Sequence, residues 1–150
     1  MASIIPPYAE YIKVIARAGE AFNRHAFSEL GLGAGHADYI RTICRNAGIT
    51  QEELTRHIGI DKSNVARTLV ILEKNGYVER RQSEEDKRVM LVYPTEKAYE
   101  VLPRVREVVR SWNSFLTEDF TPEEMEQFNS MLERITRKAT EAVNKELGED

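Results

Sequence analysis

Residues 50–93 carry the pattern that most constrains how this chain can fold, two short helices followed by two short strands. Thr50 and Glu53 stand at the spacing of a capping box, in which each side chain satisfies a backbone N–H of the other residue. Gly59 ends this first helix, and Asp61 offers the N-cap of a second. Two short helices joined by a tight turn predict a helix-turn-helix.

The second predicted helix has one apolar face and one polar face. Val65, Leu69 and Leu72 recur at helical spacing and define the side expected to be buried. The opposite side is polar, and a helix-turn-helix inserts such a side of its second helix into the DNA major groove. The residues on that outward side are Ser63, Arg67 and Lys74, with Asn64 on the flank. We therefore expect double-stranded DNA as a partner.

A β-hairpin is predicted directly after this helix. Residues 77–80 and 89–93 have strand composition, and the polar segment 82–86 between them is typical of an exposed turn. A hairpin in this position is the wing of a winged helix, whose tip can contact the DNA backbone or enter the minor groove. Phosphate contacts are expected from basic or polar side chains at the edges of this region, although a charge-rich hairpin can equally be a solvated one. These candidates are Lys62, Thr68, Arg80, Arg81 and Lys87.

Long helices are predicted on both sides of the winged helix, at about 7–30 before it and about 95–117 and 121–147 after it, and a shorter helix is predicted at about 35–46. Burying a Leu or Phe side chain is worth roughly 1.5–3 kcal/mol, and the winged helix is too small to cover all of their apolar stripes. We therefore expect a homodimer on a pseudo-palindromic site, built through the terminal helices. The alternative is a monomer whose terminal helices fold back as a bundle.

The fold class expected is mainly α with a small β-hairpin. In this interpretation the chain is a single domain over residues 1–150, in which residues 1–34 and 95–150 are dimerisation helices and residues 35–94 form the winged helix. The length of 150 residues suits one domain, and no apolar run is long enough to span a membrane. Without a secretory signal pattern, and with Cys44 as its one cysteine, the chain is expected to be cytoplasmic.

The net charge of −4 argues against a nucleic-acid partner until its distribution is considered. Residues 94–150 hold 8 basic and 13 acidic side chains, whereas residues 50–93 hold 8 of each. The acidity therefore lies outside the winged helix, whose basic residues can gather on one face. The sequence contains no phosphate-binding glycine loop, no nucleophile motif and no cysteine pair for zinc, so we expect neither an enzyme, a cofactor nor a metal site.

Four segments together resemble the MarR family of transcriptional regulators. They are Gly48-Ile-Thr-Gln-Glu-Glu-Leu54, Ile60-Asp-Lys-Ser-Asn-Val-Ala-Arg67, Leu72-Glu-Lys-Asn-Gly-Tyr-Val-Glu-Arg80 and Asp86-Lys-Arg-Val89. The resemblance implies a homodimeric winged-helix repressor or activator. It also implies that Ser63, Asn64 and Arg67 face the major groove. The resemblance also implies that Arg88 reaches the minor groove and that Asp86 holds it in place. We expect this pairing to occur in an extended strand, where the side chains of residues 86 and 88 would point to the same face.

The resemblance further implies a small aromatic or anionic effector, bound between the dimerisation helices and the winged helix. The aromatic and polar candidates for its pocket are Tyr11, Phe22, His36, Tyr39 and Arg41. Ordinary packing is the alternative explanation for each of them. The alternative function is a winged-helix protein-interaction module that binds no DNA, for which the zero net charge of residues 50–93 would be the distinguishing feature.

Overall fold

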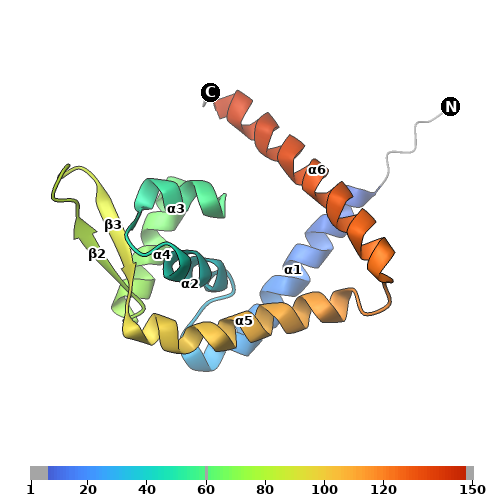
Figure 1. The fold of residues 1–150 in the computed structure, drawn as a ribbon, viewed down its shortest axis with the longest axis horizontal. Coiled ribbons are helices and arrows are strands. Elements are labelled where there is room, and N and C mark those ends of the chain that lie inside the picture. The colour runs from blue at the N-terminus through green and yellow to red at the C-terminus, as the bar shows by residue number, and fades with distance from the viewer. Residues whose placement is uncertain (1–6, 60, 148–150) are drawn as a thin grey trace. The chain divides into compact units, whose positions relative to one another are not determined.

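The computed structural model describes residues 7–59 and 61–147 of the chain (Figure 1). Its elements in chain order are α1 (Tyr8–Phe27), the 3₁₀ turn η1 (Ser28–Leu30), α2 (His36–Arg45), β1 (Ile49–Thr50), α3 (Gln51–Ile58), α4 (Lys62–Lys74), β2 (Val78–Gln82), β3 (Met90–Pro94), α5 (Glu96–Leu116) and α6 (Pro122–Leu147). The chain divides into two compact units, Met1–Trp112 and Asn113–Asp150. Among the described residues, no helix combines the length and hydrophobicity needed to cross a membrane.

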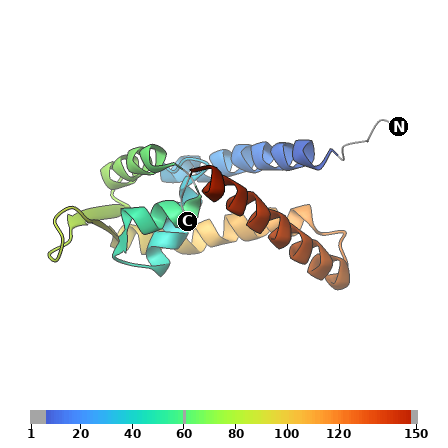
Figure 2. The same cartoon turned by 90° about the horizontal axis from the view of Figure 1, so that it is seen from above.

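The first unit contains a three-stranded antiparallel sheet in the order β1-β3-β2. Val92 at the centre of β3 pairs with Ile49 on one side and with Arg80 on the other. The hairpin β2–β3 was expected, but β1 was not, because two residues are too few to show a strand pattern. β2 and β3 project beyond α2, α3 and α4 as a long loop-tipped hairpin (Figure 2). The predicted mainly α fold with a winged helix is confirmed.

Locally encoded caps set the helix starts. The backbone N–H of Glu53 donates to Thr50 Oγ1 at 3.1 Å, and that of Thr50 donates to Glu53 Oε2 at 3.0 Å. This hydrogen bonding lowers the pKa of Glu53. The Thr121 and Glu124 pair forms a second capping box at the start of α6. The Thr50 box was predicted from its spacing, and the Thr121 pair shows the same spacing of three residues.

The core of the first unit lies between α2, α3, α4, the sheet and α5. Its completely buried aliphatic side chains include Ile43 of α2, Leu54 of α3, Leu69 of α4 and Val105 of α5. Cys44 is partly buried against this core. One side of α4 packs against this core, and the opposite side is exposed to solvent. The candidate site lies on that exposed side.

Candidate nucleic-acid interface

The turn between α3 and α4 places the second helix at the protein surface. Gly59 takes the left-handed conformation that ends α3, with φ of +69°. Asp61 then caps α4, since its Oδ1 accepts a hydrogen bond from the backbone N–H of Asn64 at 3.0 Å. Val65, Leu69 and Leu72 are fully buried. The predicted inward face of the helix is therefore confirmed.

The outward face of α4 exposes Ser63, Arg67 and Lys74, while Asn64 on the flank is half-buried and Lys62 is exposed at the first position of the helix. Among the described residues, Arg67 has no ion-pair or hydrogen-bond partner. An arginine without a carboxylate partner keeps all five of its N–H donors for another molecule. Of the expected groove-facing residues, Ser63 and Arg67 are thus exposed and Asn64 is half-buried, and the phosphate candidate Thr68 is half-buried as well.

Arg80 is committed to a contact inside the protein. Its Nε and Nη2 atoms donate to Glu73 Oε2 at 3.2 and 2.8 Å, and its backbone N–H donates to Glu73 Oε1 at 3.1 Å. Glu73 lies at the end of α4 and Arg80 in β2, so this pair ties the wing to the second helix of the helix-turn-helix. The pair is partly shielded, with the Arg80 side chain 24% exposed. Sequence reasoning missed Glu73 because the two residues belong to different elements.

Arg81 lies on the outer side of the hairpin. It pairs with Glu79 at 2.7 Å, and its guanidinium carbon lies 4.8 Å from the centre of the Tyr93 ring. The side chain remains 62% exposed, so the guanidinium is held in position without being shielded from a partner molecule. Lys87, at the tip of the hairpin, is exposed as well.

The tip of the wing holds Arg88 in a fixed orientation. Its Nε and Nη2 atoms donate to Asp86 Oδ1 and Oδ2 at 3.1 and 3.2 Å, while 91% of its side chain is exposed. The bidentate contact lowers the pKa of Asp86. The expected pairing is present, but its expected geometry was wrong, because residues 83–89 form turns instead of an extended strand.

Two backbone hydrogen bonds bring Asp86 and Arg88 together. The N–H of Val89 donates to the carbonyl oxygen of Asp86, and that of Arg88 donates to Asp86 Oδ1. Ser83 Oγ accepts from the N–H groups of Glu85 and Asp86 and shapes the preceding turn. Asp86 therefore both stabilises the loop and orients the Arg88 side chain. The sequence signal that could have predicted this turn is Ser83, three residues before Asp86, because a serine hydroxyl commonly accepts such backbone N–H groups.

The Glu73–Arg80 pair predicts a dependence of stability on pH. The Arg80 hydrogen bonds lower the pKa of Glu73 below its ordinary value of 4.5. A carboxyl with a lowered pKa in the folded state contributes stability above its ordinary pKa, and this contribution is lost as the pH falls through the folded value. We expect Glu73→Gln to lower the unfolding free energy by about 1 kcal/mol at neutral pH.

The difference between wild type and Glu73→Gln should shrink as the pH is lowered below 4.5. Thermal unfolding followed by circular dichroism across this range measures it. Glu107→Gln is the matched control, because it breaks an exposed pair with Arg104 at 2.9 Å and should cost less. An equal loss for both variants would show that the Glu73–Arg80 pair does not stabilise the wing.

The five effector candidates have different surroundings. Tyr11 is 62% exposed on α1, and the Phe22 ring stacks on Trp112 with ring centres 4.9 Å apart. His36 Nδ1 accepts the N–H of Gly33 at 2.8 Å, and burial lowers the pKa of His36. Tyr39 is buried, which raises its pKa. Each of Phe22, His36 and Tyr39 thus has a packing role, as the alternative explanation expected.

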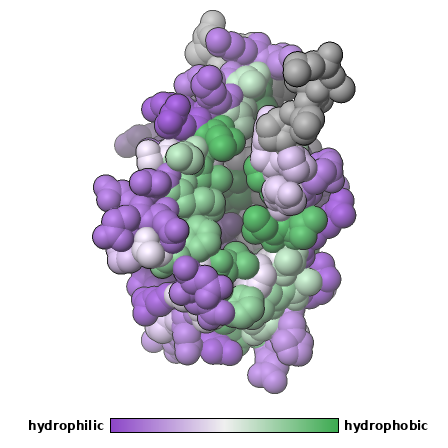
Figure 3. All heavy atoms as spheres, turned by 90° about the vertical axis from the view of Figure 1, so that its right-hand side faces the viewer, coloured by the Kyte–Doolittle hydropathy of each residue, from purple (hydrophilic) through white to green (hydrophobic). Residues whose placement is uncertain are grey.

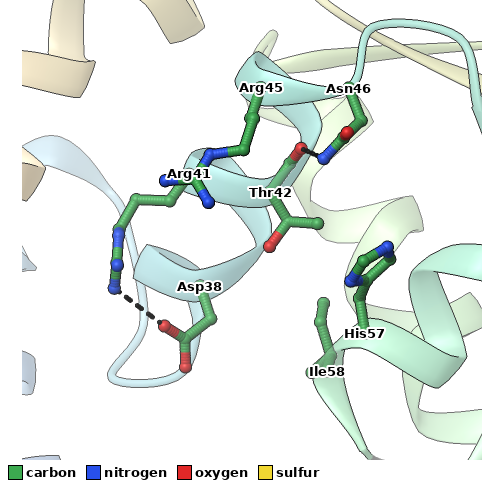
Figure 4. Close-up of a pocket in the computed structure, with 7 residues that line it drawn as sticks. All are labelled: Asp38, Arg41, Thr42, Arg45, Asn46, His57 and Ile58. Carbon is green, nitrogen blue, oxygen red and sulfur yellow. Dashed lines mark hydrogen bonds and ion pairs between the residues drawn. The ribbon is translucent and has the colours of Figure 1, made fainter.

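Arg41 lines a surface pocket of about 370 Å³ between α2 and α3 (Figure 4). Its Nη1 atom pairs with Asp38 Oδ1 at 3.3 Å. In Figure 4 the side chains of Arg41 and Arg45 lie on one side of α2, and His57 lies across the pocket on α3. The three basic groups therefore do not point toward one another, and the pocket is no ready-made anion site.

Comparisons with known proteins agree with this geometry. A family model described as the MarR family matches residues 30–89. The HTH-type transcriptional regulator YybA of Bacillus subtilis is 32% identical over 126 residues, which cover 84% of each chain. The transcriptional repressor MprA of Escherichia coli is 34% identical over 93 residues, covering 62% of this chain and 51% of MprA.

A solved structure resembles this chain over its full length. It is the structure of a MarR-family regulator from Listeria monocytogenes in complex with a 26mer DNA, and it is 30% identical to this chain. The match has a TM-score of 0.86 and covers 100% of this chain and 98% of the other. With a relative of this identity along most of its length and a matching family model, the chain belongs to the MarR family of transcriptional regulators.

Proposed function

We propose that this protein is a DNA-binding transcriptional repressor that acts as a homodimer on a pseudo-palindromic operator and is released by a small aromatic or anionic effector. The main support is the pair of open arginines in the first unit. Arg67 stands on the outward face of α4 with no ion-pair partner in the described part of the chain, and Arg88 is oriented by Asp86 at the wing tip. A helix for the major groove and a wing for the minor groove are the two parts that a winged helix uses.

The charges of the candidate site favour DNA over a protein partner. The outward face of α4 carries Arg67 and Lys74, Lys62 is exposed at the start of the helix, and no carboxylate is paired with any of the three among the described residues. Three of the acidic side chains in the neutral segment 50–93 are already committed, since Glu73, Glu79 and Asp86 pair with arginines. Each of these pairs neutralises one basic and one acidic side chain, so the segment stays formally neutral and the case for DNA rests on the basic outward face of α4.

Exposed apolar side chains on the terminal helices support the dimer. On α1, Tyr8, Tyr11, Ile12 and Ile15 share one face and are 45–62% exposed. On α6, Phe128, Leu132 and Ile135 are 39–46% exposed at helical spacing. Figure 3 shows hydrophobic side chains at the surface on the face it displays. Faces of this kind mark interaction surfaces, and a second copy of the chain would bury them.

The repressor role and the effector are supported by analogy. The relative MprA carries the name of a transcriptional repressor, and a dimer bound over a promoter would exclude other proteins from it. We propose that this protein works in the cytoplasm, as expected for a DNA-binding regulator whose similar proteins YybA and MprA come from bacteria. An effector that binds the helices outside the winged helix would weaken DNA binding if it favoured a different spacing of the two recognition helices.

The proposal is tested with a duplex from the region upstream of the protein's own gene, labelled for fluorescence anisotropy. We expect binding at low salt that weakens steeply as salt rises, because each phosphate contact releases a counterion. Arg104→Ala is the matched control, since this exposed arginine on α5 lies outside the candidate site and should leave the affinity unchanged. Equal affinity for this duplex and an unrelated one at every salt concentration would contradict the proposal of a specific regulator.

A further inference from the structure

Two exposed aliphatic side chains lie on the surface that is proposed to enter the major groove. Val70 is 51% exposed and Ile71 is 46% exposed. Between residues 28 and 98 they are the large hydrophobic residues that the described structure leaves exposed; the others lie on α1, α5, α6 and the segment between the last two helices. The other large apolar side chains that the structure describes in the winged helix are buried or half-buried.

Both residues share a face with the basic side chains of α4. Val70 and Ile71 follow Arg67 by three and four residues and precede Lys74 by four and three, so all four lie together on the outward side. At about 1.5 Å per residue, the two aliphatic side chains lie about 4.5 and 6 Å further along the helix axis than Arg67. The major groove is about 12 Å wide, so a helix that places Arg67 on a base edge keeps them at or near the groove.

Valine and isoleucine have no hydrogen-bonding group, which restricts what they can recognise. In the major groove the one apolar feature of the base edges is the C5-methyl group of thymine. A partner protein with an apolar surface is the other occupant to consider. However, Arg67 and Lys74 on the same face have no carboxylate partner within residues 7–59 and 61–147, and they would be buried without charge compensation against such a surface. The major groove of DNA offers phosphates and base edges to Arg67 and Lys74 and thymine methyl groups to Val70 and Ile71, so it suits both kinds of side chain.

We propose that Val70 and Ile71 form a thymine-reading surface next to Arg67, so that the operator carries thymine methyl groups at the positions facing the middle of α4. This inference rests on the proposed function. It adds specificity for thymine that the polar residues Ser63, Asn64 and Arg67 do not supply, since those read hydrogen-bonding groups.

The test replaces thymine by deoxyuridine, which pairs identically but lacks the C5-methyl group. The full-length protein first selects duplexes from a library with a randomised centre, and a selected duplex is then made with either base. Wild type should bind the thymine duplex more tightly by about fourfold for each methyl group in contact, from about 0.8 kcal/mol per buried carbon. The Val70→Ala, Ile71→Ala double variant should bind the two duplexes equally.

Lys74→Ala is the matched control on the same face. It removes a charge but no apolar contact, so it should weaken binding to both duplexes and preserve the ratio between them. Alanine is a strong helix former, and both aliphatic side chains are about half exposed, so α4 should persist in the double variant, as circular dichroism would verify.

The alternative outcomes separate this inference from the proposed function. Equal wild-type affinity for the two duplexes would overturn the thymine-reading surface while leaving DNA binding intact. A thymine preference that persists in the double variant would assign methyl recognition to other residues and would also overturn it. Failure of wild type to enrich any duplex would contradict the proposed function itself.

Discussion

Replacement of Arg67 by alanine is expected to weaken operator binding by about 1–3 kcal/mol, or roughly fivefold to 150-fold. Arg67 is exposed at the centre of the outward face of α4 and has no partner among the described residues that would compete for its guanidinium. A planar guanidinium can donate two hydrogen bonds to the O6 and N7 atoms of one guanine. Losing that contact should also relax base preference at one position of each half-site.

The effect of losing a base contact at Arg67 can be distinguished from the effect of losing a positive charge. Fluorescence anisotropy of wild type, Arg67→Ala and Lys74→Ala on a selected duplex and on single-base variants of it gives affinity and base preference together. Arg67→Ala should flatten the preference at one base pair, whereas Lys74→Ala should reduce affinity for all sequences alike. If both variants lose affinity without any change in base preference, Arg67 contacts the backbone and does not read a base.

Arg88→Ala in the same assay should lower affinity through the wing. Because Asp86 already holds the Arg88 guanidinium, little conformational entropy is lost when it enters a minor groove. The Arg67→Ala, Arg88→Ala double variant should bind much more weakly than wild type at low salt. Equal binding by wild type and the double variant would remove the DNA interpretation of both elements.

Charges placed on the apolar face of α1 are expected to abolish the dimer and most operator binding. Ile12 and Ile15 are 45% and 49% exposed, and burial of a glutamate at either position of an interface would be strongly unfavourable. Sedimentation should then give the chain mass of 17.2 kDa for Ile12→Glu, Ile15→Glu, against twice that mass for wild type. Losing the linkage between two recognition helices should lower affinity by roughly 10²- to 10⁴-fold.

Arg17→Glu is the matched control for this double variant. It changes the net charge of the chain by the same amount, but Arg17 lies on the opposite, polar side of α1. This control should remain a dimer and retain most of its affinity, apart from a small effect of the added charge. A wild-type protein that sediments as a monomer at micromolar concentration would contradict the dimer directly.

Interactions between near neighbours in the chain could be predicted from the sequence. The capping boxes at Thr50 and Thr121, the Asp61 cap and the apolar side of α4 each depend on residues a few positions apart. Their geometry follows from helix dimensions alone. The order of elements, and with it the winged helix and the family, follows from these same local patterns.

Contacts between different elements could not be predicted in this way. The hydrogen bonds of Arg80 to Glu73 depend on how the hairpin packs against α4, and β1 exists only because Ile49 and Thr50 meet β3. Asp86 and Arg88 were expected to pair, but a turn brings them together where a strand was expected.

For DNA recognition, helix periodicity was enough to predict which side of α4 faces outward and which residues stand on that side. Which basic side chains remain exposed depends on how the helices and strands pack against one another. Arg67 and Arg88 present their guanidinium groups to solvent, whereas Arg80 is held by Glu73 and serves the fold. The physical reason is that helix periodicity is a local property, while the partner of a long charged side chain is chosen by whichever elements pack beside it.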